Sequence, residues 1–182
     1  MELLKSLQRI LAYNSSQEDK KAALWLLSNI VLNSMQDLKA VLTCGIMVNV
    51  SLACQSISTS VKKEAIFTVS NMINKLCIED ELQEIETLLQ QYNIEENLLD
   101  VLRNVQTPPE IQQLALLTFE YLFKLDEEDD DGSNYRQNFV QLGGLDVLRK
   151  TLMIEGVKEI SDKANELNET YFVVEYEEDS ER

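Results

Sequence analysis

Residues 20–29 read KKAALWLLSN, and residues 62–71, which begin 42 residues later, read KKEAIFTVSN. Both stretches have two lysines, a central alanine, an aromatic residue and a closing Ser-Asn pair. A sequence that repeats with a period in the forties is typical of stacked helical repeats. Each unit of such a stack is a small group of helices that buries its apolar face only against a neighbour. The repeated stretch therefore predicts a helical solenoid.

The composition also favours helices joined by short polar connections. The 182 residues include five glycines and two prolines, and 45% of them are hydrophobic. Sandwiches and barrels need many tight turns, which glycine and proline usually supply, so these classes are disfavoured. We expect an all-α protein, long enough to bury a hydrophobic core.

Apolar residues recur at helical spacing along most of the chain. A short helix, a middle helix and then a long helix carrying the aromatic residue and the asparagine make a three-helix unit. The predicted cap boxes are Ser15 with Glu18, Ser34 with Asp37, and Thr107 with Glu110, and Gly45 is expected to end a helix. The predicted helices span residues 1–13, 17–32, 35–43, 46–54, 61–76, 79–92, 94–105, 108–125, 145–153 and 157–172, with a further helix starting near residue 134 after a charged loop at 126–133.

Charge is spread unevenly. Residues 1–76 carry eight basic and five acidic side chains, a net charge of +3, whereas residues 77–182 carry eight basic and 27 acidic ones, a net charge of −19. An acidic surface repels phosphate backbones and attracts basic partners, so we expect no nucleic-acid partner.

Several functional classes lack the residues they require. The chain has no histidine, no glycine-rich phosphate loop and no nucleophile motif, so we expect neither an enzyme nor a cofactor. Its three cysteines, Cys44, Cys54 and Cys77, lack CxxC spacing, which disfavours a zinc site and predicts small buried hydrophobes in a reducing compartment. Asn138 at the last position of an EF-hand-like stretch, which includes Glu127, Asp129, Asp131 and Gly132, disfavours calcium binding. No signal-type or 18-residue apolar stretch is present, so we expect an intracellular protein without a membrane span.

Three stretches resemble armadillo repeats and, more narrowly, the C-terminal third of the importin-α family. Residues 20–30, KKAALWLLSNI, look like the repeat motif in which Asn follows Trp by four positions on the third helix. Residues 42–52, LTCGIMVNVSL, resemble the join of the first and second helices, with Val48 where proline is usual. The end of the chain, from Gly144 to the acidic residues 175–181, looks like the last repeat and terminus of the family.

The resemblance implies a right-handed superhelical solenoid of three-helix repeats. Residues 1–172 would form an armadillo-repeat domain of about three full repeats plus a partial N-terminal one, and residues 173–182 an acidic tail. Under this resemblance, the chain would lack the basic N-terminal importin-β-binding segment of the family and the first half or more of its solenoid, as either a fragment or a short relative. The second unit has Phe67 in place of Trp, and the third has Leu117 and Tyr121 where the Trp and Asn would fall.

The spacing of Trp25 and Asn29 puts both on one helical face, one turn apart. An asparagine amide can bond the backbone of an extended peptide, and an aromatic face can flank a Lys or Arg stem and attract its charge. The resemblance then implies that a concave groove binds basic nuclear localisation signals at the minor site of the family. The implied residues are Trp25, Ser28, Asn29, Glu64, Phe67, Ser70 and Asn71.

Two interpretations compete with this one. Trp25 and Phe67 could be core aromatics, with the asparagines tying helix ends. Alternatively, the chain is a generic armadillo scaffold that binds another kind of partner and has no transport role.

Under the importin-α resemblance the protein would work in cytoplasm and nucleus, and its last repeats and tail would dock the nuclear export receptor. An uncapped helix at residues 1–13 would also allow a homodimer.

Overall fold

A computed structural model describes residues 2–12, 14–128, 134–153 and 158–173. Every regular element in these ranges is an α-helix, so the predicted all-α class is confirmed. Three units of three helices follow one another, as the repeat predicts: α3–α4–α5, α6–α7–α8 and α9–α10–α11, each with two short helices followed by a longer one. The helices are α1 (Glu2–Ala12), α2 (Gln17–Asn33), α3 (Met35–Thr43), α4 (Met47–Cys54), α5 (Thr59–Ile78), α6 (Leu82–Tyr92), α7 (Ile94–Arg103), α8 (Pro109–Glu128), α9 (Tyr135–Gln141), α10 (Gly144–Leu152) and α11 (Lys158–Tyr171).

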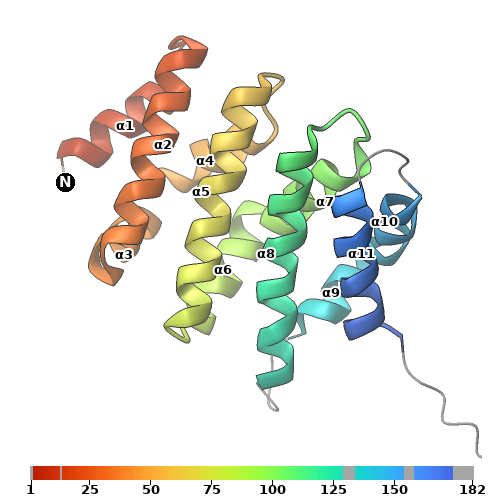
Figure 1. Cartoon of the computed structure of the whole chain (residues 1–182). Coiled ribbons are helices and arrows are strands. Elements are labelled where there is room, and N and C mark those ends of the chain that lie inside the picture. The colour runs from red at the N-terminus through yellow and green to blue at the C-terminus, as the bar shows by residue number, and fades with distance from the viewer. Residues whose placement is uncertain (1, 13, 129–133, 154–157, 174–182) are drawn as a thin grey trace, which may run out of the picture.

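The helices α2, α5, α8 and α11 stand side by side in one layer (Figure 1). Behind them, α1, α4, α7 and α10 form a second series in which each helix contacts the next. The short helices α3, α6 and α9 lead from the end of one long helix into this second series (Figure 1). Because each unit packs against its neighbours in the chain, the molecule is a stack of similar units. The layer of long helices forms one side of this stack.

The first helix starts agree with the predicted type of cap, with one shift in position. Ser34 precedes α3 as predicted, and its hydroxyl accepts a hydrogen bond from the backbone N–H of Asp37 at 3.1 Å. The cap of α2 is Ser16, bonded to Asp19 N–H at 3.1 Å, and not Ser15 with Glu18. Using the second serine puts both Glu18 and Asp19 in the first turn, where acids face the positive end of the helix.

The start of α8 differs from the sequence prediction. The helix begins at Pro109, and the carbonyl of Pro108 accepts the first hydrogen bond, from Ile111 N–H at 2.9 Å. Thr107 therefore lies one residue before the cap position, and its buried hydroxyl has no partner within the described part of the chain. The predicted threonine cap is wrong because the second proline, not the first, takes the first helical position. Glu110 bonds its own backbone N–H instead, which lowers its pKa.

The end of α8 also differs, because the helix continues to Glu128 and so includes Asp126, which the sequence pattern predicts in a loop. The Asp126 carboxylate accepts hydrogen bonds from the backbone N–H groups of Tyr135, at 3.0 Å, and Arg136, at 2.6 Å. A buried carboxylate thus caps α9 from the preceding long helix. Residues 129–133, with most of the EF-hand-like positions, lie outside the described residues, as do residues 174–182 of the tail.

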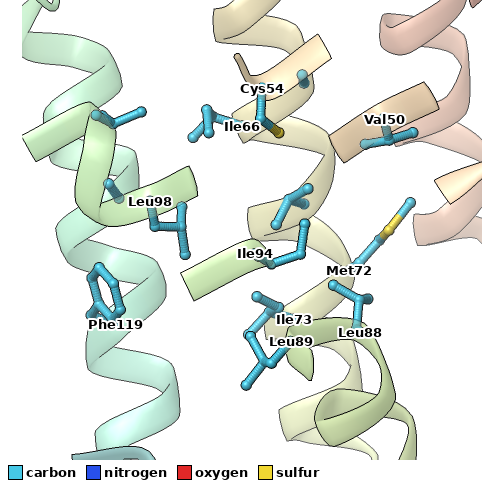
Figure 2. Packing of buried hydrophobic residues seen from close by; sticks show 14 of the residues in the cluster. Val50, Cys54, Ile66, Met72, Ile73, Leu88, Leu89, Ile94, Leu98 and Phe119 are labelled. Atoms are coloured by element: carbon cyan, nitrogen blue, oxygen red, sulfur yellow. The ribbon is translucent and has the colours of Figure 1, made fainter. Parts of the chain in front are cut away.

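Apolar side chains from five successive helices meet between the layers (Figure 2). Helix α5 contacts both α2 and α8, so it is apolar on two sides and buries residues along its whole length. Each fully buried Leu or Ile contributes about 1.5–3 kcal/mol relative to exposure, which holds the stack together. The labelled side chains are Val50, Cys54, Ile66, Met72, Ile73, Leu88, Leu89, Ile94, Leu98 and Phe119.

The cysteines follow the predicted role to different degrees. Cys54 is buried and packs as a small hydrophobe, and this burial raises the pKa of its thiol to about 12. A thiol with such a pKa stays protonated and unreactive near neutral pH. Cys44 and Cys77 are only half-buried.

Within the described ranges, no single helix has the length and apolar character needed to span a membrane. The bent pair α3 and α4 meets that criterion jointly, by length and composition.

Candidate peptide-binding face

Trp25 and Asn29 lie one turn apart on the solvent-facing side of α2, and 57% of Trp25 is exposed. Phe67 and Asn71 occupy the matching positions on α5, where Phe67 is 38% exposed and Asn71 is half-buried. Since α2 and α5 pack directly on each other, the two pairs lie on neighbouring helices of one layer. We call this side of α2 and α5 the ladder face. The exposure of both aromatics argues against the alternative that they belong to the core.

The two asparagines differ in their hydrogen bonds. The side-chain N–H of Asn29 donates to the backbone carbonyl of Trp25 at 2.7 Å, which fixes the orientation of the amide on α2. The side-chain nitrogen of Asn71 is buried and has no acceptor among the described residues. A buried amide without a partner costs about 1–3 kcal/mol, and a peptide acceptor that draws the Asn71 side chain outward would remove this penalty. Asn71 is thus the amide with an unused donor, and Asn29 the one already oriented.

The two serines of the repeated motif lie inside the protein. Ser28 is 2% exposed, and its hydroxyl donates to the carbonyl of Trp25 at 2.7 Å. Ser70 is 5% exposed and shares a 2.7 Å hydrogen bond with the hydroxyl of Thr118 on α8. Neither hydroxyl faces solvent, because that of Ser28 bonds within α2 and that of Ser70 joins α5 to α8. Of the seven predicted site residues, these two are not on the ladder face.

Glu64 lies one turn before Phe67 on α5 and is half-buried. The hydroxyl of Thr68 donates to the Glu64 carbonyl at 2.7 Å and also lies 3.2 Å from the Leu24 carbonyl on α2. This buried threonine joins the two helices directly beneath the ladder face. Ala22, the counterpart of Glu64 on α2, is exposed and carries no charge. The ladder face therefore has one acid beside Phe67 and none at the matching position beside Trp25.

The ladder face does not continue unchanged onto α8. Helices α5 and α8 are each 20 residues long, and Leu117 and Tyr121 occupy the positions along α8 that Phe67 and Asn71 occupy along α5. Both are half-buried, and Tyr121 packs against the core. The aromatic–asparagine pair is thus replaced by an aliphatic and an aromatic residue, as the sequence indicated.

Charged side chains connect α8 to α11. The Glu120 carboxylate lies 2.8 Å from the Lys163 ammonium on α11 and 3.0 Å from that of Lys124. Burial raises the pKa of Glu120, but the hydrogen bonds from the two lysines outweigh it and leave the pKa below its usual range. Lys163 also pairs with Glu166 at 3.0 Å. These charged groups already pair with one another, so this end of the layer leaves fewer unpaired charges for a ligand.

A cavity of about 430 Å³ lies beside the ladder face, between α1, α2 and α3. Asn29 lines it, together with Leu3 and Leu4 from α1 and Asp37 from α3. No local sequence pattern indicates this cavity, because its lining comes from three separate helices.

The residues that fix the ladder face from below are not among those predicted from the sequence. Besides Thr68, the ammonium of Lys75 donates to the Leu32 carbonyl at 2.9 Å and so joins α5 to α2 a second time. Thr118 does the same between α8 and α5 through Ser70. Two threonines at matching positions of α5 and α8, each bonding the carbonyl four residues earlier, were the available signal.

Solved structures with the same arrangement are designed armadillo repeat proteins. One, computationally designed for modular peptide recognition, superposes with a TM-score of 0.74 at 17% identity and covers 91% of this chain. A designed armadillo repeat protein in complex with the peptide (KR)4 gives a TM-score of 0.69 at 19% identity over 90% of this chain. The chain spans 63% of the length of each. No protein-family profile matches, and no curated protein sequence does.

The likeness establishes the fold: the chain is an all-α armadillo-type solenoid. At these identities it does not extend to a particular family, so the predicted importin-α membership stays a prediction.

Proposed function

We propose that this protein is a peptide-binding scaffold that holds an extended segment of a partner protein across the ladder face. The observation that carries the proposal is the pair of exposed aromatic–asparagine positions, Trp25–Asn29 and Phe67–Asn71, on two adjacent helices. A peptide crossing α2 and α5 would meet one amide and one aromatic ring per helix. The amides bond its backbone irrespective of its sequence, and the rings flank its side chains.

The chemistry of the face favours a basic peptide. Trp25 offers the ring type that binds a cation best, and Phe67 a weaker one. Glu64 would meet the ammonium or guanidinium group of a residue lying against Phe67. The net charge of −16 attracts a basic segment to the molecule as a whole, but the ladder face lies within residues 1–76, whose net charge is +3, so this attraction is weaker at the site itself. Because the ladder face has one acid and only one tryptophan, we expect modest affinity.

A narrower proposal follows from the sequence resemblance to importin-α. The basic segment would be a nuclear localisation signal, and the protein an adaptor for import that works in cytoplasm and nucleus. The Ser-Asn motif at matching positions of α2 and α5 supports it. The general scaffold proposal needs only the geometry of the ladder face, so it survives if the transport role fails.

Trp25 is the single tryptophan of the chain, so its fluorescence reports on the proposed site directly. The intact chain is titrated with a peptide of alternating Lys and Arg, and with a peptide of equal length in which glutamine replaces each basic residue. We expect a saturable change in Trp25 emission with the basic peptide. The affinity should fall as salt is raised, because screening weakens exposed charge pairs.

The neutral peptide separates the two levels of the proposal. Equal binding of both peptides would support a general scaffold and contradict the preference for basic segments. Binding of neither peptide, followed by calorimetry as an independent readout, would contradict the peptide-binding proposal altogether.

A further inference from the structure

A second cavity is lined by residues of the α4–α5 turn and the α7–α8 turn. Both turns lie at the top of Figure 1. Its volume is about 350 Å³. Several lining residues carry hydrogen-bond donors, among them Lys62, Thr59 and Gln106. No described lining residue is acidic, although the chain has 32 acidic residues. This cavity is therefore suited to an anion.

The N-terminus of α5 opens into this cavity through Thr59. Ser58 stands at the cap position but makes no side-chain cap hydrogen bond, and the first turn holds no acid. At the start of α2, by contrast, Ser16 caps Asp19 N–H. The first N–H groups of α5 have no acceptor within the helix, and the helix dipole makes this end positive. Lys62, which makes no ion pair in the described ranges, adds a full charge one turn further on.

Thr107 supplies a second, independent observation. It lines the cavity, is 6% exposed, and its hydroxyl has no hydrogen-bond partner among the described residues. Its backbone is held in place, because its N–H donates to the Asn104 carbonyl at 2.8 Å. A buried hydroxyl without a partner is unfavourable, and rotation of the Thr107 side chain toward an oxygen-rich ligand in the cavity would provide the missing bond.

We propose that this cavity binds a tetrahedral oxyanion of the phosphate type through Lys62, the first N–H groups of α5 and the Thr107 hydroxyl. Several donors arranged around one volume match the oxygens of such an anion. The anion is either free phosphate or the phosphate of a modified side chain. The neighbouring Lys63 is not part of the site, because its ammonium already faces the Glu110 carboxylate at 3.4 Å.

The site is tested by following the backbone amide resonances of the intact chain by NMR. Inorganic phosphate is titrated at constant ionic strength, and O-phosphoserine is titrated separately. We expect saturable shifts that are largest at residues 59–61. Tighter binding of O-phosphoserine would identify a modified side chain as the source of the phosphate, and tighter binding of inorganic phosphate the free ion.

Two variants and one control make the test specific. Lys62→Ala should weaken phosphate binding about tenfold, the loss expected for one charge-assisted hydrogen bond, whereas Lys63→Ala should change it less than about twofold. Thr107→Val, which keeps the shape and removes the hydroxyl, should also weaken binding, and the amide spectrum shows whether each variant folds. The proposal is overturned by absent shifts, by equal effects of the two lysine variants, or by unchanged binding in Thr107→Val.

Discussion

The two ends of the long-helix layer share one backbone arrangement and carry different chemistry. On α2 and α5 the solvent-facing positions hold exposed aromatics beside asparagines, here Trp25 with Asn29. Across α8 and α11, the carboxylate of Glu120 is instead matched by Lys163 at 2.8 Å. Buried positions thus determine how the helices pack on one another, whereas two solvent-facing positions per helix determine what the layer can bind. The comparison predicts that changes at the α8–α11 end alter stability, and changes on the ladder face alter affinity.

The largest expected effect is a loss of stability from a change at the α8–α11 end. Asp126→Ala removes the two hydrogen bonds that the carboxylate accepts at the start of α9, at 3.0 and 2.6 Å. Bonds to a charged group contribute most when buried, so the free energy of unfolding should fall by about 3 kcal/mol in chemical denaturation. Asp162→Ala, an exposed acid on α11, is the control. An unchanged free energy of unfolding in Asp126→Ala would contradict this role.

The next effect concerns pH. One carboxylate oxygen of Glu95 is buried without a partner in the described structure. Burial first, and the negative charge of Asp126 second, raise its pKa from 4.5 to about 7. The folded state therefore binds this proton more tightly than the unfolded chain, and stability falls as pH rises from about 4.5 to about 7.

Glu95→Gln removes this penalty. The variant should be more stable than the parent by about 2 kcal/mol near pH 8 and should differ little near pH 4, as measured by denaturation at each pH. The exposed Glu86→Gln serves as the control for general charge reduction. An equal stabilisation at both pH values would show that Glu95 does not titrate as described.

The smallest effects concern affinity on the ladder face. Phe67→Trp gives α5 the better cation-binding ring and should tighten a basic peptide about threefold. Ala22→Glu supplies the missing acid beside Trp25 and should tighten it about twofold at low salt. Calorimetry measures both, because a second tryptophan would confuse the fluorescence of Trp25. Leu142→Glu, on the turn between α9 and α10, adds the same charge away from the ladder face. An equal gain in peptide affinity there would show that the effect of Ala22→Glu comes from net charge alone.

Much of the fold could be predicted from the sequence because helical periodicity and caps are local signals. The bounds of α3 were predicted to the residue, since Ser34 and Gly45 mark its two ends. The failures lie where the deciding contact is distant in the sequence. Asp126 looked like part of a charged loop, but it is helical and its carboxylate bonds the start of α9. At Thr107, two adjacent prolines left the first helical position ambiguous.

The candidate site could be predicted only in part. The exposed pairs on α2 and α5 follow from spacing, because positions four apart share a helical face. The burial of Ser28 and Ser70 does not, since it depends on how each long helix meets the next. The cavity lined by Lys62 and Thr107 is formed by two turns that are far apart in the sequence, so no local pattern predicts it.

The most direct test of the account is the affinity of the double variant Asn29→Ala plus Asn71→Ala for the basic peptide, measured by Trp25 fluorescence. If these amides bond the peptide backbone, losing about 1 kcal/mol at each should weaken binding about thirtyfold. Asn49→Ala on α4, in the second series of helices, is the matched control and should bind as the parent does. Unchanged affinity in the double variant would contradict the assignment of the ladder face as the peptide-binding site.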